Sequence, residues 1–180
     1  MTIKFAQISD LHFSNDYKHS AGEYFEIMNK MDNPFIQLKS LFDNVKKDFD
    51  FILLTGDICE YGKISEYQMV KQELSKYFNC PIYSTSGNHE NKMNYLKGFL
   101  DKNSDQTIFE DYLSKNYRVI CLDSSNEKYQ NGYISEESCE LLRQALRRKT
   151  GLPTFLITHH NYWINNLRCL KQSIRKNLKT

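Results

Sequence analysis

Residues 51–57 read Phe-Ile-Leu-Leu-Thr-Gly-Asp, and this stretch decides the fold of the chain. The run from Phe51 to Thr55 is continuously apolar up to its last residue, which predicts a strand buried inside a sheet. Asp57 then follows at the carboxyl end of that strand. A carboxylate in this place can approach a cation closely.

Three further runs share this arrangement, in which polar side chains follow directly on a predicted strand. Residues 3–8 precede Asp10-Leu11-His12, residues 81–85 precede Gly87-Asn88-His89-Glu90, and residues 153–158 precede His159-His160. In open α/β sheets, ligands bind outside the carboxyl ends of the strands, where groups far apart in sequence converge. We therefore expect the four polar clusters to meet at one site.

The rest of the pattern predicts one α/β domain in which strands and helices alternate. The 180 residues are 40% hydrophobic and 13% aromatic, which is enough to build a core. A strand is predicted over 118–122, and helices over 34–47, from a cap at Ser65 to Tyr77, and from Ser135 to about Lys149. The stretch 13–33 is longer than a usual α/β loop, and it either overhangs a site or packs as a surface excursion.

The polar clusters carry the oxygen and nitrogen donors of metal sites. Asp10 and His12 lie two residues apart, so on an extended segment both side chains project from one face and can bind one ion. In Gly87-Asn88-His89, the glycine permits an unusual backbone turn. Taken singly, each cluster has a structural explanation, such as a helix cap for Asp57. Because four such explanations would have to hold together, a shared metal site is the better hypothesis.

The order of the clusters resembles the calcineurin-like metallophosphoesterase superfamily, whose blocks are D-x-H, G-D, G-N-H-D/E, H and G-H-x-H. The first four blocks are present in order, over about residues 3–161. The branch of class III cyclic-nucleotide phosphodiesterases and glycerophosphodiesterases is the most similar, because residues 55–62 with Glu66-Tyr67 look like its second block and following helix. An Asp-Arg-Gly after that block, typical of protein Ser/Thr phosphatases, is absent.

The resemblance implies a layered α/β/β/α fold, with two packed sheets flanked by helices, and a centre of two divalent metal ions. The ligands that it implies are Asp10 and His12 on one ion, Asp57 on both ions, and Asn88 and His159 on the second. His89 would face the substrate. His160 is the alternative, either behind the ligands or as a substitute for His159.

The activity implied by the resemblance is hydrolysis of phosphoester bonds, above all phosphodiesters, by in-line attack of a metal-bridging hydroxide. His89 would protonate the departing alkoxide. Mn, Fe, Zn and Co all suit mixed oxygen and nitrogen ligands, so the metal is not identified by the sequence. No organic cofactor is implied.

The family's last block, Gly-His-x-His, has no counterpart, since residues 161–180 contain neither glycine nor histidine. The resemblance therefore implies a fold that is incomplete at its C-terminal side, with a partial metallophosphoesterase domain over 1–163 and a tail over 164–180 that holds five cations and no acid. Three interpretations stay open: an active phosphodiesterase with fewer ligands, a truncated and weakly active or inactive metal-binding member, and a non-catalytic module that binds through its tail.

Location and partners follow from what the sequence lacks. No apolar stretch has the length of a secretory signal, and none approaches the roughly 20 residues of a membrane span, so we predict a cytoplasmic protein. Five cysteines without a Cys-x-x-Cys pair are expected to be reduced thiols. The expected partner is a small phosphoester; nucleic acid is not indicated. The identity of the substrate and the oligomeric state do not follow from the sequence.

Overall fold

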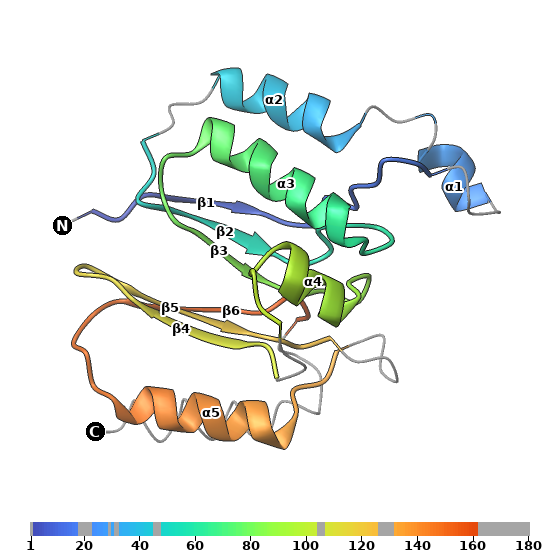
Figure 1. Ribbon diagram of the computed structural model, residues 1–180. Helices are drawn as coiled ribbons and strands as arrows, with labels where there is room; N and C mark the ends of the chain where they lie inside the picture. Colours follow the sequence, from blue (N-terminus) through green and yellow to red (C-terminus); the bar gives the residue numbers. More distant parts are fainter. Residues whose placement is uncertain are drawn as a thin grey trace.

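The computed structural model describes residues 2–17, 23–28, 30, 33–44, 48–103, 107–125 and 132–161. Within these residues, six strands form two three-stranded sheets, and five helices accompany them (Figure 1). The strands are β1 (Phe5–Ile8), β2 (Phe51–Thr55), β3 (Ile82–Thr85), β4 (Phe109–Leu113), β5 (Arg118–Leu122) and β6 (Thr154–Ile157). The helices are α1 (Glu23–Met28), α2 (Pro34–Asn44), α3 (Ile64–Tyr77), α4 (Lys92–Gly98) and α5 (Glu136–Arg147).

The two sheets pack face to face, with helices on their outer sides (Figure 1). In the first sheet β1, β2 and β3 are parallel and lie in this order, so β2 is central. In the second sheet β5 is central, antiparallel to β4 and parallel to β6. Helices α2 and α3 cover the first sheet, and α5 covers the second. The predicted α/β/β/α layering is confirmed.

Successive side chains of β2 enter different cores, because side chains alternate across a strand. Ile52 and Leu54 pack against the helices that cover the first sheet, whereas Phe51 and Leu53 pack against the second sheet. Strand β5 behaves in the same way, with α5 on its outer side. Burial on both faces explains why these two strands are continuously apolar in sequence.

The predicted helix starts at Pro34 and after Ser135 agree with α2 and α5, and that of α3 does not; the predicted end of the first helix at about Lys47 lies outside the described residues. Ser135 caps α5 as predicted, and its hydroxyl accepts a hydrogen bond from the Ser138 N–H at 3.0 Å. The predicted cap at Ser65 is wrong, because Lys63 holds that position. The Glu66 carboxylate reaches back to the Lys63 N–H at 3.3 Å, which satisfies the helix start two residues earlier.

Three elements were not predicted. Helices α1 and α4 are short, with 6 and 7 residues, and β4 reads Phe-Glu-Asp-Tyr-Leu, which has no continuous apolar run. Helix α1 lies within the stretch 13–33. The expectation of an incomplete C-terminal side and of a basic tail concerns residues 162–180, which lie outside the described residues and leave it a prediction.

Two smaller expectations can be compared with the structure. Cys59, Cys80 and Cys121 are free thiols, as expected, but Cys139 takes part in a disulfide, so that prediction is wrong for Cys139. Among the described residues, none of the helices has both the length and the apolar character that crossing a bilayer requires.

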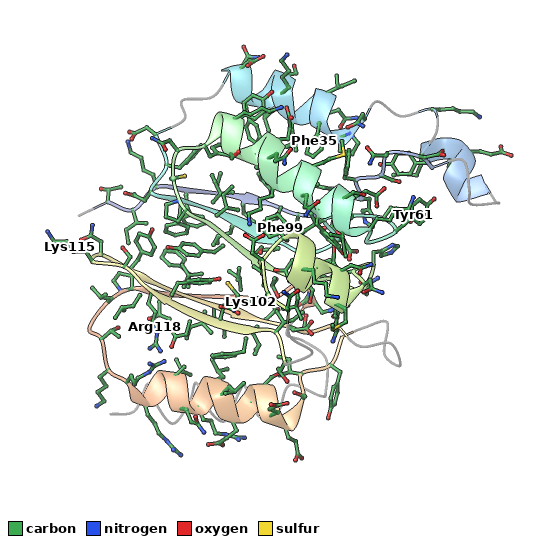
Figure 2. The ribbon with its side chains drawn as sticks, in the orientation of Figure 1. Phe35, Tyr61, Phe99, Lys102, Lys115 and Arg118 are labelled. Carbon is green, nitrogen blue, oxygen red and sulfur yellow. The ribbon has the colours of Figure 1, made fainter. Side chains whose placement is uncertain are left out.

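A buried arginine joins the second sheet to α5. Figure 2 shows Arg118 in the layer between them. Its guanidinium donates two hydrogen bonds to the Asp111 carboxylate, at 2.7 and 2.6 Å, and one to the Ala145 carbonyl at 2.8 Å. The Arg118 side chain is only 4% exposed, so its charge depends on Asp111. The pair thereby fixes the C-terminal end of α5 to the sheet.

The Asp111→Ala variant tests this joint. Removing one partner leaves a buried charge uncompensated, so we expect the free energy of unfolding to fall by about 3–5 kcal/mol. Urea unfolding followed by circular dichroism measures the change. Leu113→Ala, on the same strand but 65% exposed, is the control and should shift stability by no more than about 0.5 kcal/mol. Equal effects of the two substitutions would show that the ion pair does not stabilise the layer.

Candidate metal centre

The loops after β1 and β2 run side by side and hydrogen-bond to each other. The backbone N–H of Asp10 donates to the Gly56 carbonyl at 3.1 Å, and the N–H of His12 donates to the Asp57 carbonyl at 2.9 Å. These bonds extend the pairing of the two parallel strands beyond the sheet. The D-x-H and G-D blocks are therefore brought together by the register of β1 on β2.

Three of the predicted ligands adopt left-handed backbone conformations. Asp10, His12 and Asp57 have φ angles of 56°, 45° and 48°. Such conformations cost a non-glycine residue on the order of 1 kcal/mol or more and persist only where the surroundings enforce them. Here the hydrogen bonds between the two loops enforce them. This concentration of backbone strain at three adjacent polar residues is typical of a functional site.

The Asp57 carboxylate lies at the middle of the site. Its Oδ1 accepts the backbone N–H of His89 at 3.0 Å. Its Oδ2 lies 3.6 Å from Nε2 of His12 and 3.4 Å from Nε2 of His159. Two ligands that each lie about 2.1 Å from one tetrahedral ion are about 3.4 Å apart, so both separations suit ligands that share an ion. One oxygen atom thus faces two imidazoles.

Two groups of side chains could each hold a metal ion, and Asp57 belongs to both. In one group the ligand atoms of Asp10, Asp57 and His159 lie within 4.8 Å of one another, and in the other those of His12, Asp57 and His89 do. Five of the six predicted carboxylates and imidazoles therefore converge, and His160 is the one outside both groups. Their grouping differs from the implied ligand sets, since Asp10 lies with His159 and His12 with His89.

Both histidines beside Asp57 are oriented through their other ring nitrogen. Nδ1 of His159 lies 2.9 Å from the Thr55 carbonyl, so Nδ1 carries a proton that it donates to this oxygen. Nε2 is therefore the ring nitrogen whose lone pair could bind a metal ion. Nδ1 of His12 lies 2.7 Å from Oε2 of Glu60. A carbonyl or carboxylate behind a histidine is the usual support of a metal ligand. The donor set, with three carboxylate or imidazole groups on each side, therefore fits divalent metal ions.

Two glutamates that were not assigned a role support the site. Glu60 is buried and also lies 3.5 Å from Nδ1 of His89, so one carboxylate serves two histidines. Glu90 accepts the backbone N–H groups of Asp57 at 3.0 Å and of Ile58 at 2.5 Å, and also that of Gly87. Their places three residues after Asp57 and directly after His89 were the only sequence signals for these roles.

The glycines of the two blocks are required by close packing. A Cβ on Gly87 would lie 2.2 Å from Oδ1 of Asp57, and one on Gly56 would lie 2.6 Å from Nδ1 of His159. Gly56 also has a φ of 90°. Gly87 is not among the glycines with a positive φ, so the feature that requires a glycine there is the contact with Asp57, which leaves no space for a side chain.

Two predicted residues contribute in other ways. Asn88 is exposed. Its two neighbours in the sequence, Gly87 and His89, both contact Asp57, so the backbone of Asn88 lies beside the centre. His160 belongs to neither group of ligand atoms. Its Nδ1 lies 3.0 Å from the Ser124 hydroxyl, and its ring packs edge-on against His159 with centroids 4.8 Å apart. The roles of both residues remain predictions.

The protonation states of Asp57 and His159 are coupled. Burial alone would raise the pKa of Asp57, but hydrogen bonds from His159 and from the His89 N–H lower it to about 2. Burial alone would lower the pKa of His159, but Asp57 and the Thr55 carbonyl raise it to about 9. Without metal, the pair is therefore a carboxylate and an imidazolium at neutral pH.

This coupling predicts how the stability of the metal-free protein depends on pH. Protonated His159 adds to the free energy of unfolding. This stabilisation is fully present below the ordinary histidine pKa of 6.5 and is lost as the pH rises through about 9. That of Asp57 is complete above 3.8 and is lost as the pH falls through about 2. Thermal unfolding in the presence of a chelator measures both limits. The stability advantage over His159→Gln should shrink between pH 6.5 and 9; a constant difference would contradict the coupling.

The Glu90→Gln variant tests the support of the Asp57 loop. Burial raises the pKa of Glu90, yet its partners here are all N–H donors, so the carboxylate is the form that satisfies them. A glutamine has only one acceptor oxygen, and its NH₂ group would face the backbone N–H groups that Glu90 accepts. We therefore expect the free energy of unfolding to fall by about 1–3 kcal/mol. Glu73→Gln, a surface residue paired with Lys76, is the control and should change stability little. Similar unfolding curves for both variants would contradict this role.

A pocket of about 560 Å³ adjoins the centre. Asp10 and His12 form one wall, and residues of α2 form another. Tyr17 and Met28, which lie in the stretch 13–33, also line it. Of the two alternatives for this stretch, the overhang beside the site is supported at Tyr17 and Met28, two of its described residues.

Comparison with known proteins places this geometry in a family. Residues 3–176 match the calcineurin-like phosphoesterase family. A probable glycerophosphodiester phosphodiesterase of Arcobacter nitrofigilis is 28% identical over 160 residues, which cover 86% of this chain and 55% of that protein. A 3',5'-cyclic adenosine monophosphate phosphodiesterase of Haemophilus influenzae is 25% identical over 175 residues, which cover 97% of this chain and 61% of that protein.

A solved structure shares the fold. A purple acid phosphatase from yellow lupin superposes with a TM-score of 0.53 at 13% identity, over 82% of this chain and 28% of that one. The chain spans 55–61% of the length of the two curated relatives above. Because the family match covers nearly the whole chain and the four polar blocks converge, this chain belongs to the calcineurin-like phosphoesterase family.

Proposed function

We propose that the protein hydrolyses phosphoester bonds, most of all phosphodiesters, with the help of two divalent metal ions. The observation that carries this proposal is the position of Asp57, whose Oδ2 faces His12 at 3.6 Å and His159 at 3.4 Å. A carboxylate between two sets of donors is suited to bridge a pair of ions. The phosphodiesterase names of the relatives support the bond type.

The proposed ligands are Asp10, His12, Asp57, Asn88 and His159, with Asp57 shared by both ions; the ligand atoms of Asp10 and His159 lie together beside Asp57, and that of His12 belongs to the other group. When bound, such ions lower the pKa of water and neutralise phosphate oxygens. The chain's own contribution is to hold these donors in place without metal, through Glu60 behind His12, the Thr55 carbonyl behind His159, and Glu90 behind the Asp57 loop. Mn, Fe, Zn and Co remain the candidate metals.

His89 is the proposed proton donor to the leaving alkoxide. Its backbone is fixed by the hydrogen bond to Asp57, and its ring packs edge-on against His12 with centroids 4.6 Å apart. Its side chain is 35% exposed, more than that of His12 at 19%, so it is the more accessible to a substrate. Oε2 of Glu60 lies 3.5 Å from Nδ1 of His89, so this carboxylate is placed to orient the ring.

The test is to measure metal content and hydrolysis of bis(p-nitrophenyl) phosphate on the purified protein. We expect bound divalent metal and turnover that a chelator abolishes. His89→Ala should lower kcat by about 10²–10⁴-fold at saturating metal, since a general acid acts in the chemical step, and should reduce the metal content less than the loss of Asp57 does. Asp57→Asn should lower both, because it removes the shared carboxylate.

Asp48→Asn is the matched control, since it makes the same change in an exposed ion pair with Lys4. It should leave metal content and kcat as they are. Metal binding without turnover would overturn the proposal in favour of a weakly active or inactive member of the family. No metal, but salt-sensitive binding of nucleic acid, would overturn it in favour of a binding module.

A further inference from the structure

The pocket beside the metal centre has walls of a distinct chemistry. Its residues come from the loop after β1, from the stretch that follows it and from α2: Ser9, Asp10, Leu11, His12, Tyr17, Met28, Pro34, Gln37, Leu38 and Leu41. Half of them are apolar, and among these described lining residues there is neither lysine nor arginine. A second phosphate or a carboxylate would therefore find no lysine or arginine partner among them.

Tyr17 adds apolar surface rather than a free hydroxyl. Its Oη donates to the His12 carbonyl at 2.6 Å and accepts the Ser14 N–H at 3.1 Å. Both bonds hold the ring beside the loop that carries Asp10 and His12. Gln37 contributes an uncharged amide from α2. The pocket can thus enclose a largely apolar group and offer a hydrogen bond from Gln37 to a polar atom on that group.

Helix α2 is fixed relative to the centre. Phe35, which is labelled beside α2 in Figure 2, packs on Phe13 with ring centroids 4.5 Å apart. Phe13 follows His12 directly in the sequence. The N–H of Phe13 donates to the Ile58 carbonyl at 3.0 Å, which ties the same segment to the loop of Asp57. The apolar wall is thereby packed against the segment that carries Asp10 and His12, as in a largely pre-formed pocket.

We propose that this pocket binds the organic group esterified to the phosphorus, and that this group is uncharged and largely apolar. The inference rests on the proposed function, since Asp10 and His12 belong to both the centre and the pocket wall. A phosphate held at the centre would direct one ester substituent along that wall. The volume of about 560 Å³ falls in the range of pockets that enclose small organic ligands.

The experiment compares two phosphonates that differ only in the organic group. Methylphosphonate and phenylphosphonate are titrated calorimetrically into the metal-loaded protein. Because the phenyl ring would leave water for the apolar wall, we expect phenylphosphonate to bind at least about tenfold more tightly. The readout is binding, so it does not depend on turnover.

Matched variants on α2 locate the difference. Leu41 lines the pocket and is 56% exposed, while Ile36 is 60% exposed and does not line it. Leu41→Asn should reduce the preference for phenylphosphonate at least about threefold, and Ile36→Asn should preserve it. Met28→Gln, on α1, tests the same wall without altering α2. Methylphosphonate should bind all variants equally, which also shows that they are folded.

The outcomes separate this inference from the proposed function. Equal affinity for the two phosphonates would overturn the inference alone, and so would a preference that survives both Leu41→Asn and Met28→Gln. Failure of methylphosphonate to bind the metal-loaded protein would overturn the proposed function, and the inference with it.

Discussion

The site depends on the backbone conformation of Asp57 at the end of the central strand of the first sheet. A left-handed aspartate directly after Gly56 is strained, and the hydrogen bonds from its loop to Glu90 hold it there. With the backbone held, Oδ1 is taken by the His89 N–H and Oδ2 is left facing two imidazoles. If the Asp57 loop relaxed, the side chains after β1, β3 and β6 would lose their common neighbour.

The order of the strands explains why the centre lies where it does. Because β2 is between β1 and β3, the loop that follows it borders the loops of both neighbours. The second sheet adds the loop after β6. Hydrogen bonds that join the two sheets near the site include those from the Ser86 hydroxyl to Asp123 at 2.8 Å and from the Thr85 hydroxyl to the Leu122 carbonyl at 3.1 Å. Four carboxyl ends therefore meet at one side of the molecule, as open α/β sheets allow.

The strands that are continuously apolar could be predicted from sequence, because burial on both faces leaves a strong signal. β2 and β5 have the predicted bounds, and the convergence of the polar clusters followed from placing each at a strand end. Strand β4 was missed because it is an edge strand with a mixed pattern. The proximity of Asp10 to His159 could not be predicted from local pattern, because it depends on how the two sheets dock; which of these residues bind the same ion stays a prediction.

The roles of Glu60 and Glu90 could not be predicted for a related reason. Each contacts a group about 30 to 50 positions away in the chain. Glu90 accepts the backbone N–H of Asp57, and Glu60 contacts the imidazole of His12. Nothing in the spacing of a glutamate tells whether it supports a ligand or lies on the surface. The requirement for glycine at position 87 could not be predicted either, because it comes from close contact with an atom of Asp57, which is distant in the sequence.

The contact between His159 and Gly56 has a consequence for how the site assembles. The imidazole comes from the second sheet and rests on a glycine of the first, with no space for a Cβ between them. The centre cannot be complete in either half of the molecule alone, and it forms only when the halves have closed on each other. Sliding of the second sheet relative to the first would move His159 away from Gly56 and Asp57. The centre would then be disrupted even if each sheet kept its own hydrogen bonds.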